Sequence, residues 1–253
     1  MKVINENTLY IVGAGPGNPE LLTIKAYKTI EKAQVILYDN LVNKELLDIA
    51  PESCIKYYVG KHPYGDYVSQ DNINDLIAFY CERYERVVRL KGGDPYLFGR
   101  GFEEWAVAKR LGVQVEYIPG ISSMQGAGWN NIPLTHRNVA EGVWILTGMK
   151  KDGSLSSDLA LAAQSSATVV IYMGMRKLAE IARNYVMYGK GDLPAAIIQH
   201  ATLPQQKSVV CQVQDLLKTS EQHGLGHPAI IVIGEVVNLQ YALTLAAMKQ
   251  DVV

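Results

Sequence analysis

Residues 90–101, LKGGDPYLFGRG, combine residue types that can hold a ligand against the main chain. Gly92 and Gly93 have no side chains, so a ligand can lie flat against the backbone there. Asp94 can accept a hydrogen bond from an ammonium or a hydroxyl group. The apolar run before this segment predicts a strand, so the segment lies at the carboxyl edge of a sheet, where open α/β folds bind ligands. The pattern therefore indicates a ligand-binding loop.

A second glycine-rich segment, residues 13–19 (GAGPGNP), follows the first apolar run and precedes a stretch with helical spacing. A dinucleotide-binding loop occupies this position, and Asp39, at the end of the next predicted strand, would then bind the ribose. Asn18 stands where that motif has its third glycine, and Pro16 removes a backbone donor from the loop. A nicotinamide-dependent oxidoreductase is therefore an alternative hypothesis, but Asn18 and Pro16 argue against it.

Strands that end at one edge of a sheet are needed to position these loops. Short β-branched and aromatic runs predict strands over residues 9–12, 35–38, 55–59, 87–90, 113–118, 143–147, 168–172, 195–199, 208–213 and 229–233. Helical spacing is clearest over residues 20–33, 70–83, 102–111 and 177–188. Strands alternating with amphipathic helices predict an α/β fold with mostly parallel sheets.

The chain length of 253 residues suggests about two domains at ~150 residues each. Pro119 and Gly120 interrupt the alternation of strands and helices near the middle. We therefore expect an N-terminal α/β domain over residues 1–119, a C-terminal α/β domain over residues 120–242, and a tail over residues 243–253. The second half ends in pairs of strands, which predicts a mixed sheet in that domain.

Composition excludes several classes of protein. Hydrophobic residues make up 48% of the chain, too many for a disordered protein. The formal net charge is -1, so no overall basic field exists to bind a nucleic acid or an anionic membrane. No apolar run approaches the ~18–20 residues of a membrane helix. The 3 cysteines form no CxxC pair and no cluster with histidines, so we expect a cytoplasmic protein with free thiols and no metal site.

Four segments together resemble a known family. They are residues 9–22 (LYIVGAGPGNPELL), 59–61 (VGK), 90–101 (LKGGDPYLFGRG) and 132–137 (IPLTHR). With weaker matches they cover the chain to about residue 240, and they are similar to the uroporphyrinogen-III C-methyltransferases of the tetrapyrrole methylase superfamily. The resemblance implies two α/β domains, with S-adenosyl-L-methionine bound in a cleft between them, and a homodimer. It also implies methylation of uroporphyrinogen III at C2 and C7, by way of precorrin-1 to precorrin-2, on the branch toward sirohaem and cobalamin.

The resemblance assigns roles to individual residues. Asp39 and Lys61 match the family's proton acceptor and donor, although a turn-capping acid and a solvated lysine are the structural alternatives. Burial or a negative neighbour would have to make Asp39 a stronger base. The residues matched to the methyl donor are Pro16, Gly92, Gly93, Asp94, Leu97, Ser122, Ser123, Met173 and Ala201. Met173 and Ala201 could equally be ordinary packing residues.

The implied substrate is a polycarboxylate, so cations should converge on it. Besides Lys61, the candidates at predicted strand ends are Lys91, Arg100, His136, Arg137 and Lys150. The two arginines suit bidentate carboxylate binding, and scattered surface charge is the alternative for each residue.

The chain departs from the family pattern at His62, Asp66 and Met149, near the expected tetrapyrrole side. These departures motivate a third hypothesis, a tetrapyrrole carrier that has kept the fold without the activity. Retention of Asp39, Lys61 and both glycine-rich segments opposes this hypothesis.

Overall fold

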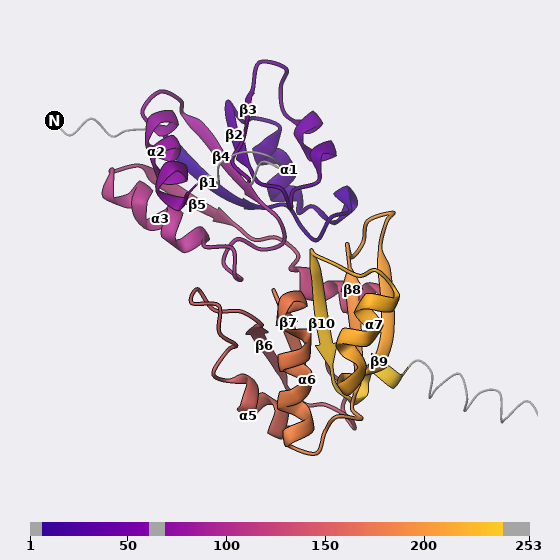
Figure 1. Ribbon diagram of the computed structural model, residues 1–253. Coiled ribbons are helices and arrows are strands. Elements are labelled where there is room, and N and C mark those ends of the chain that lie inside the picture. The colour runs from indigo at the N-terminus through magenta and orange to yellow at the C-terminus, as the bar shows by residue number, and fades with distance from the viewer. Residues whose placement is uncertain (1–6, 61–68, 240–253) are drawn as a thin grey trace, which may run out of the picture. The chain divides into compact units, whose positions relative to one another are not determined.

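A computed structural model describes residues 7–60 and 69–239 of the chain. The chain divides into two units, Met1–Ser123 and Met124–Val253 (Figure 1). The domain boundary expected after residue 119 lies just before this division. Lys61, His62 and Asp66 fall outside the described residues.

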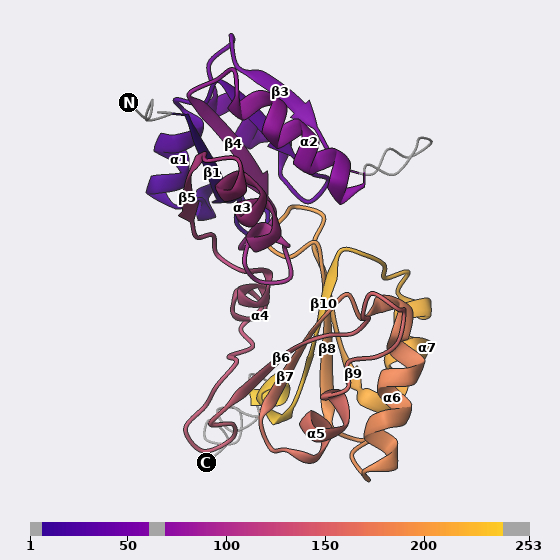
Figure 2. The same cartoon turned by 90° about the vertical axis from the view of Figure 1, so that its left-hand side faces the viewer.

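The first unit is an open parallel sheet with helices on both faces (Figures 1 and 2). Its strand order is β3-β2-β4-β1-β5, and each neighbouring pair is parallel. Its strands and helices are β1 (Thr8–Gly13), α1 (Ile24–Ile30), β2 (Val35–Tyr38), β3 (Ile55–Tyr58), α2 (Gln70–Cys81), β4 (Arg86–Lys91), α3 (Gly101–Arg110) and β5 (Gln114–Ile118). The parallel pairing brings the carboxyl ends of these strands, and the loops that follow them, to one edge.

Alternating side chains bury both faces of this sheet. Leu9 and Ile11 of β1 pack in the core that α2 and α3 cover, whereas Val12 packs in the core under α1. Strands apolar on both sides are expected where helices cover both faces of a parallel sheet. A polar residue of a strand also points to one of these two faces, so its partner must come from the elements that cover that face.

The first helix starts later than its spacing predicts. Residues 20–33 have helical spacing, but Pro19–Leu21 form a short 3-10 turn capped by the side chain of Asn18. Helix α1 begins only at Ile24, after Thr23 accepts a hydrogen bond from the Ala26 N–H. The first glycine-rich segment is therefore not followed directly by the N-terminus of an α-helix.

The second unit is built on a mixed sheet, which confirms the expectation from its strand pairs. The order is β6-β7-β10-β8-β9, in which β6 and β7 are parallel and the other neighbours are antiparallel. The elements are α4 (Gly126–Trp129), β6 (Val143–Thr147), α5 (Leu159–Gln164), β7 (Thr168–Tyr172), α6 (Leu178–Met187), β8 (Pro194–Gln199), β9 (Lys207–Gln212), α7 (Leu216–Gln222) and β10 (Ala229–Ile233). The predicted α/β class is therefore confirmed for both units.

Helices cover the two faces of this mixed sheet unequally. One core lies between the sheet and α5, α6 and α7, where Tyr185 of α6 is fully buried. The other core is smaller and includes Ala127 of the short helix α4 and Ile132. Within residues 7–60 and 69–239, no helix is both long and apolar enough to cross a membrane.

Candidate functional site

At the carboxyl edge of the first sheet, the end of β1 and the loops after β4 and β5 pack backbone against backbone. Gly13 is the last residue of β1, Gly93 lies in the loop after β4, and Gly120 lies in the loop after β5. A Cβ on Gly120 would lie 2.2 Å from the Gly93 carbonyl oxygen and 2.8 Å from the Gly13 Cα. Gly93 also exchanges backbone hydrogen bonds with Gly15 of the first glycine-rich segment, at 2.7 and 3.3 Å. The two glycine-rich segments that stood out in the sequence thus meet at one place.

The reason for glycine at position 92 differs from the sequence-based expectation. We expected a bare backbone surface for a ligand, but a Cβ on Gly92 would lie 2.5 Å from the Cβ of Leu41. Gly93 has φ +66°, a conformation that L-residues with side chains rarely adopt. Close approach of the protein's own chain and a left-handed turn therefore account for this glycine pair within the first unit.

Asp94 fastens the LKGGDP loop to the strand β5 and the loop after it. One carboxylate oxygen accepts from the Tyr96 N–H at 2.8 Å. The other accepts from the Tyr117 hydroxyl at 2.6 Å and from the Gly120 N–H at 3.1 Å. Burial, followed by the hydrogen bond to Asp94, raises the pKa of the Tyr117 phenol, so the phenol stays a donor. Asp94 thus holds this edge together, a role that the sequence did not reveal.

Replacing Tyr117 with phenylalanine should lower the free energy of unfolding by about 1–2 kcal/mol, because a charge-assisted hydrogen bond to a half-buried carboxylate is lost. Urea denaturation measures this loss. Tyr27 is half-exposed on α1, so Tyr27→Phe is the matched control, and its unfolding free energy should stay within about 0.5 kcal/mol of wild type. Equal effects of the two substitutions would contradict the role given to the Asp94–Tyr117 bond.

The other residues matched to the methyl donor in this unit lie around the same edge. Leu97 closes a turn, its N–H donating to the Asp94 carbonyl at 3.3 Å. The Ser123 hydroxyl oxygen would be 3.3 Å from a Cβ on Gly93, so it lies directly beside that glycine. Pro16 is half-buried in the first glycine-rich segment, and Ser122 is half-buried before Ser123. These four residues therefore lie in the loops that follow β1, β4 and β5.

Asp39 lies at the same edge, just after β2, and forms an ion pair with Arg89. Its Oδ2 accepts from Nη2 of Arg89 at 3.3 Å, and its Oδ1 accepts from the Leu41 N–H at 3.1 Å. For Asp39 to be a stronger base, we expected it to be buried or to lie beside a negative group. The structure instead shows a partly exposed carboxylate beside the positively charged Arg89, so neither expected condition is met.

Lys91 does not fit the expected role of binding a substrate carboxylate. Its side chain is only 6% exposed, and its Nζ donates to Oε1 of Glu104 on α3 at 2.9 Å. Burial and the neighbouring Arg89 lower the pKa of Lys91, while Glu104 opposes that shift. The ammonium is therefore committed to a partner inside the unit.

Sequence reasoning missed Arg89 and Glu104. The Arg89 guanidinium is 3% exposed and donates from Nε to the fully buried Glu104 at 3.0 Å. A signal was available, because Arg89 and Lys91 are two residues apart and alternate with the apolar residues Val88 and Leu90. Side chains at that spacing point to the same face of a sheet, so two cations there need a buried carboxylate on the helix that covers it.

The remaining cations predicted to bind substrate are exposed. Arg100 precedes α3 with φ 58°, and its guanidinium forms an ion pair with Glu103 at 2.6 Å. In the second unit, His136, Arg137 and Lys150 are exposed. Each can reach a dissolved ligand from the surface of its own unit.

Met173 and Ala201 have different surroundings within the second unit. Met173 follows β7, has φ 55° and is 49% exposed. Ala201 is buried, and a Cβ on Gly126 would lie 2.5 Å from the Ala201 Cβ, so Ala201 packs tightly against α4. His200 and Thr202 on either side of Ala201 have positive φ values. A left-handed backbone at non-glycine residues of a loop often marks a functional segment.

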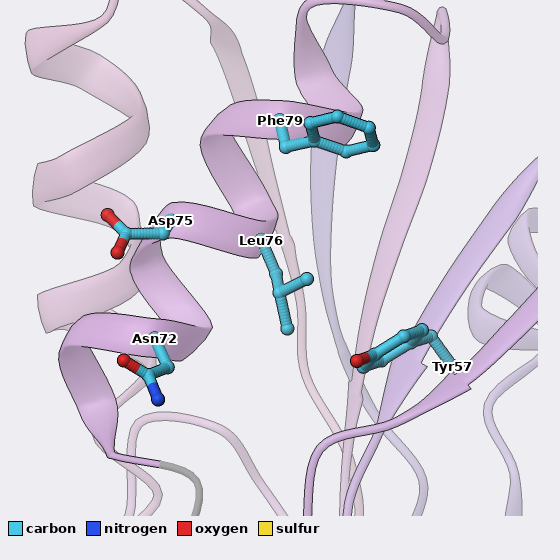
Figure 3. A pocket seen from close by; sticks show the side chains of 5 residues that line it. All are labelled: Tyr57, Asn72, Asp75, Leu76 and Phe79. Carbon is cyan, nitrogen blue, oxygen red and sulfur yellow. The ribbon is translucent and has the colours of Figure 1, made fainter.

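A groove with a volume of about 490 Å³ lies between β3 and α2. Tyr57 of β3 lies opposite Leu76 of α2 in this groove (Figure 3). Asn72, Asp75 and Phe79 complete the described lining, which contains a carboxylate and no cation. This groove contains none of the sequence-predicted site residues, and its charge does not suit a polycarboxylate.

Sequence comparison assigns the chain to a class of enzymes. The family model "Tetrapyrrole (Corrin/Porphyrin) Methylases" matches residues 8–217. This range includes both glycine-rich segments, Asp39 and all the strands and loops described above except β10. The chain belongs to the tetrapyrrole methylase family.

Particular relatives narrow the comparison. The chain is 45% identical to the uroporphyrinogen-III C-methyltransferase of Bacillus subtilis over 93% of both chains. It is 42% identical to the siroheme synthase of Chromobacterium violaceum, of which it spans 50%. Among solved structures, it resembles the uroporphyrin-III C-methyltransferase of Thermus thermophilus complexed with S-adenyl homocysteine. That likeness has a TM-score of 0.80 and 37% identity, and it covers 92% of this chain and 100% of that one.

Proposed function

We propose that this chain is an S-adenosyl-L-methionine-dependent uroporphyrinogen-III C-methyltransferase. It methylates uroporphyrinogen III at C2 and C7 and gives precorrin-2 by way of precorrin-1. The observation that carries this proposal is the 45% identity to the Bacillus subtilis enzyme over 93% of both chains. The similarity to the Thermus thermophilus structure, which is complexed with S-adenyl homocysteine, supports S-adenosyl-L-methionine as the methyl donor.

The edge built by the two glycine-rich segments is where the donor is proposed to bind. The backbones of Gly13, Gly93 and Gly120 meet there with no room for side chains, which fixes the loops after β4 and β5 beside each other. Ser123 places a hydroxyl beside Gly93, where it can donate to a ribose or carboxylate oxygen. In the second unit, Met173 and Ala201 remain the residues assigned to the donor. The bound donor supplies an electrophilic sulfonium methyl group, which a pyrrole carbon of the substrate attacks.

The chain's own part in the reaction is orientation and proton transfer. After methylation the macrocycle must lose a proton, and Asp39 is assigned to accept it because it reaches the sheet edge as a carboxylate. Lys61, which lies outside the described residues, is assigned to donate a proton. Arg100, His136, Arg137 and Lys150 are exposed cations assigned to the substrate carboxylates. Orientation of the two reactants contributes several kcal/mol to the lowering of the barrier.

The proposal extends to assembly and location. A homodimer is part of it, as implied by the family resemblance. The cytoplasm is the proposed compartment, because Cys54, Cys81 and Cys211 are all free thiols. Burial raises the pKa of the Cys81 thiol to about 12, so that thiol stays protonated and unreactive.

Calorimetry and turnover test the activity together. We expect saturable binding of S-adenosyl-L-homocysteine and formation of a dimethylated product from uroporphyrinogen III and S-adenosyl-L-methionine. Donor binding without any product would instead favour the tetrapyrrole carrier. Saturation-transfer NMR with NAD(P)H should give no signal. A signal there, with no binding of S-adenosyl-L-homocysteine, would favour the oxidoreductase.

A further inference from the structure

A chain of buried charges runs from helix α3 to Asp39. Arg89 and Lys91 of β4 both donate to Oε1 of Glu104, at 3.0 and 2.9 Å. The guanidinium of Arg89 then reaches Asp39 at 3.3 Å. Exposed side-chain fractions are 0% for Glu104, 3% for Arg89 and 6% for Lys91, against 20% for Asp39. Asp39 is therefore the member through which this buried cluster meets solvent.

The geometry leaves the Arg89 guanidinium little freedom. Its Nε donates to Glu104, and its Nη1 donates to the carbonyl oxygens of Leu37 and Leu90 at 3.3 and 2.9 Å. The Nη2 that remains points to Asp39. Because the group is planar, acceptors on α3, β2 and β4 together determine where Nη2 lies. Arg89 is thus held in place by three acceptors other than Asp39.

The orientation of the Asp39 carboxylate follows from this arrangement. Arg89 holds Oδ2 and the Leu41 N–H holds Oδ1, so each oxygen has a separate donor. The formal charges of Arg89 and Lys91 balance those of Asp39 and Glu104. Arg89 and the Leu41 N–H therefore fix the carboxylate at both of its oxygens.

We infer that Arg89 and Glu104 are positioning residues for Asp39: Arg89 orients the carboxylate, and Glu104 holds Arg89 in place. This inference rests on the proposed function, because it assigns Asp39 to proton transfer. Neither Arg89 nor Glu104 needs to touch the substrate. Their effect on the rate passes through Asp39, which makes the inference testable by a double-mutant cycle.

The cycle compares the wild-type chain with Arg89→Gln, Asp39→Asn and the double variant, using uroporphyrinogen III turnover. Arg89→Gln should lower kcat about 10- to 100-fold, because a small misplacement of a reacting group has effects of that size. The KM for S-adenosyl-L-methionine should change by less than about threefold. On the Asp39→Asn background, Arg89→Gln should cause no further loss of kcat, since residues that act as a unit are non-additive. A purely structural role would lower kcat by the same factor on both backgrounds.

Arg86 provides the matched control. It lies at the amino end of the same strand, where its guanidinium stacks over the Tyr10 ring at 4.8 Å. Arg86→Gln removes an arginine from β4 without touching Asp39, so kcat should stay within about twofold of wild type. An equal loss of kcat in Arg86→Gln and Arg89→Gln would overturn the inference.

Two conservative variants keep the test decisive if Arg89→Gln does not fold. Arg89→Lys retains the charge but not the planar set of donors, and Glu104→Gln retains the volume but not the charge. Each should lower kcat at least about fivefold on the wild-type background and not on the Asp39→Asn background. Unchanged kcat in both variants overturns the inference. A wild-type chain that makes no methylated product instead overturns the proposed function.

Discussion

Replacing Asp39 with asparagine is expected to lower kcat by about 100-fold or more, the effect of losing a positioned proton acceptor. The amide has nearly the same shape, and its oxygen can still accept from the Leu41 N–H that now bonds Oδ1. It cannot take up a proton. Binding of S-adenosyl-L-homocysteine should stay within about threefold, because the Asp39 carboxylate bonds to Leu41 and Arg89 and does not fasten the loop of Gly93 and Asp94. Steady-state kinetics and calorimetry measure the two quantities.

Asp48 is the matched control for that substitution. It is an exposed aspartate in the 3-10 segment Lys44–Ile49, in the same unit. Asp48→Asn should leave both kcat and donor binding unchanged. If Asp39→Asn turns over as fast as Asp48→Asn, then Asp39 serves only to cap the turn at Leu41, which was the structural alternative.

Most of the fold could be predicted because its strands are apolar on both faces. Val35–Tyr38, Val143–Thr147, Thr168–Tyr172 and Ala229–Ile233 begin and end where the sequence predicts. The start of α1 could not be predicted as well. Residues 20–23 have helical spacing, but the side chain of Asn18 caps a separate short turn and Thr23 then caps the helix. Spacing alone does not show which of two capping residues starts the helix.

The sequence identified several residues of the candidate site correctly, but it did not give the physical reason why each residue is there. The glycines stood out correctly, yet Gly92 is glycine because Leu41 packs against it, a contact between residues far apart in sequence. Arg89 and Glu104 were missed for a related cause. A motif shows the residue types that it contains, but not the buried partner on another element that each of them requires. Lys91 looked like a surface cation for the same reason.

A Gly120→Ala variant should show how far the donor-binding edge depends on this backbone packing. If the loops did not move, the added Cβ would lie 2.2 Å from the Gly93 carbonyl oxygen and 2.8 Å from the Gly13 Cα. The nearby atoms belong to the backbones of Gly93 and Gly13, which cannot turn away as a side chain can. We expect unfolding to become easier by about 3 kcal/mol, the upper end for overpacking. Chemical denaturation followed by circular dichroism measures this loss.

The same variant should also weaken donor binding. The Gly120 N–H donates to Asp94 at 3.1 Å, so pushing the two loops apart lengthens the bond that fastens the LKGGDP segment. Affinity for S-adenosyl-L-homocysteine should fall at least about tenfold in the folded variant, equivalent to about 1.4 kcal/mol.

A Gly112→Ala variant is the control that separates crowding from backbone strain. Gly112 has φ +74°, but nothing lies within 4 Å of an added Cβ. Gly112→Ala should cost about 1 kcal/mol of stability and leave donor binding intact. Should the two variants lose equal stability and bind the donor equally well, the close packing of Gly13, Gly93 and Gly120 would have no part in building the donor site.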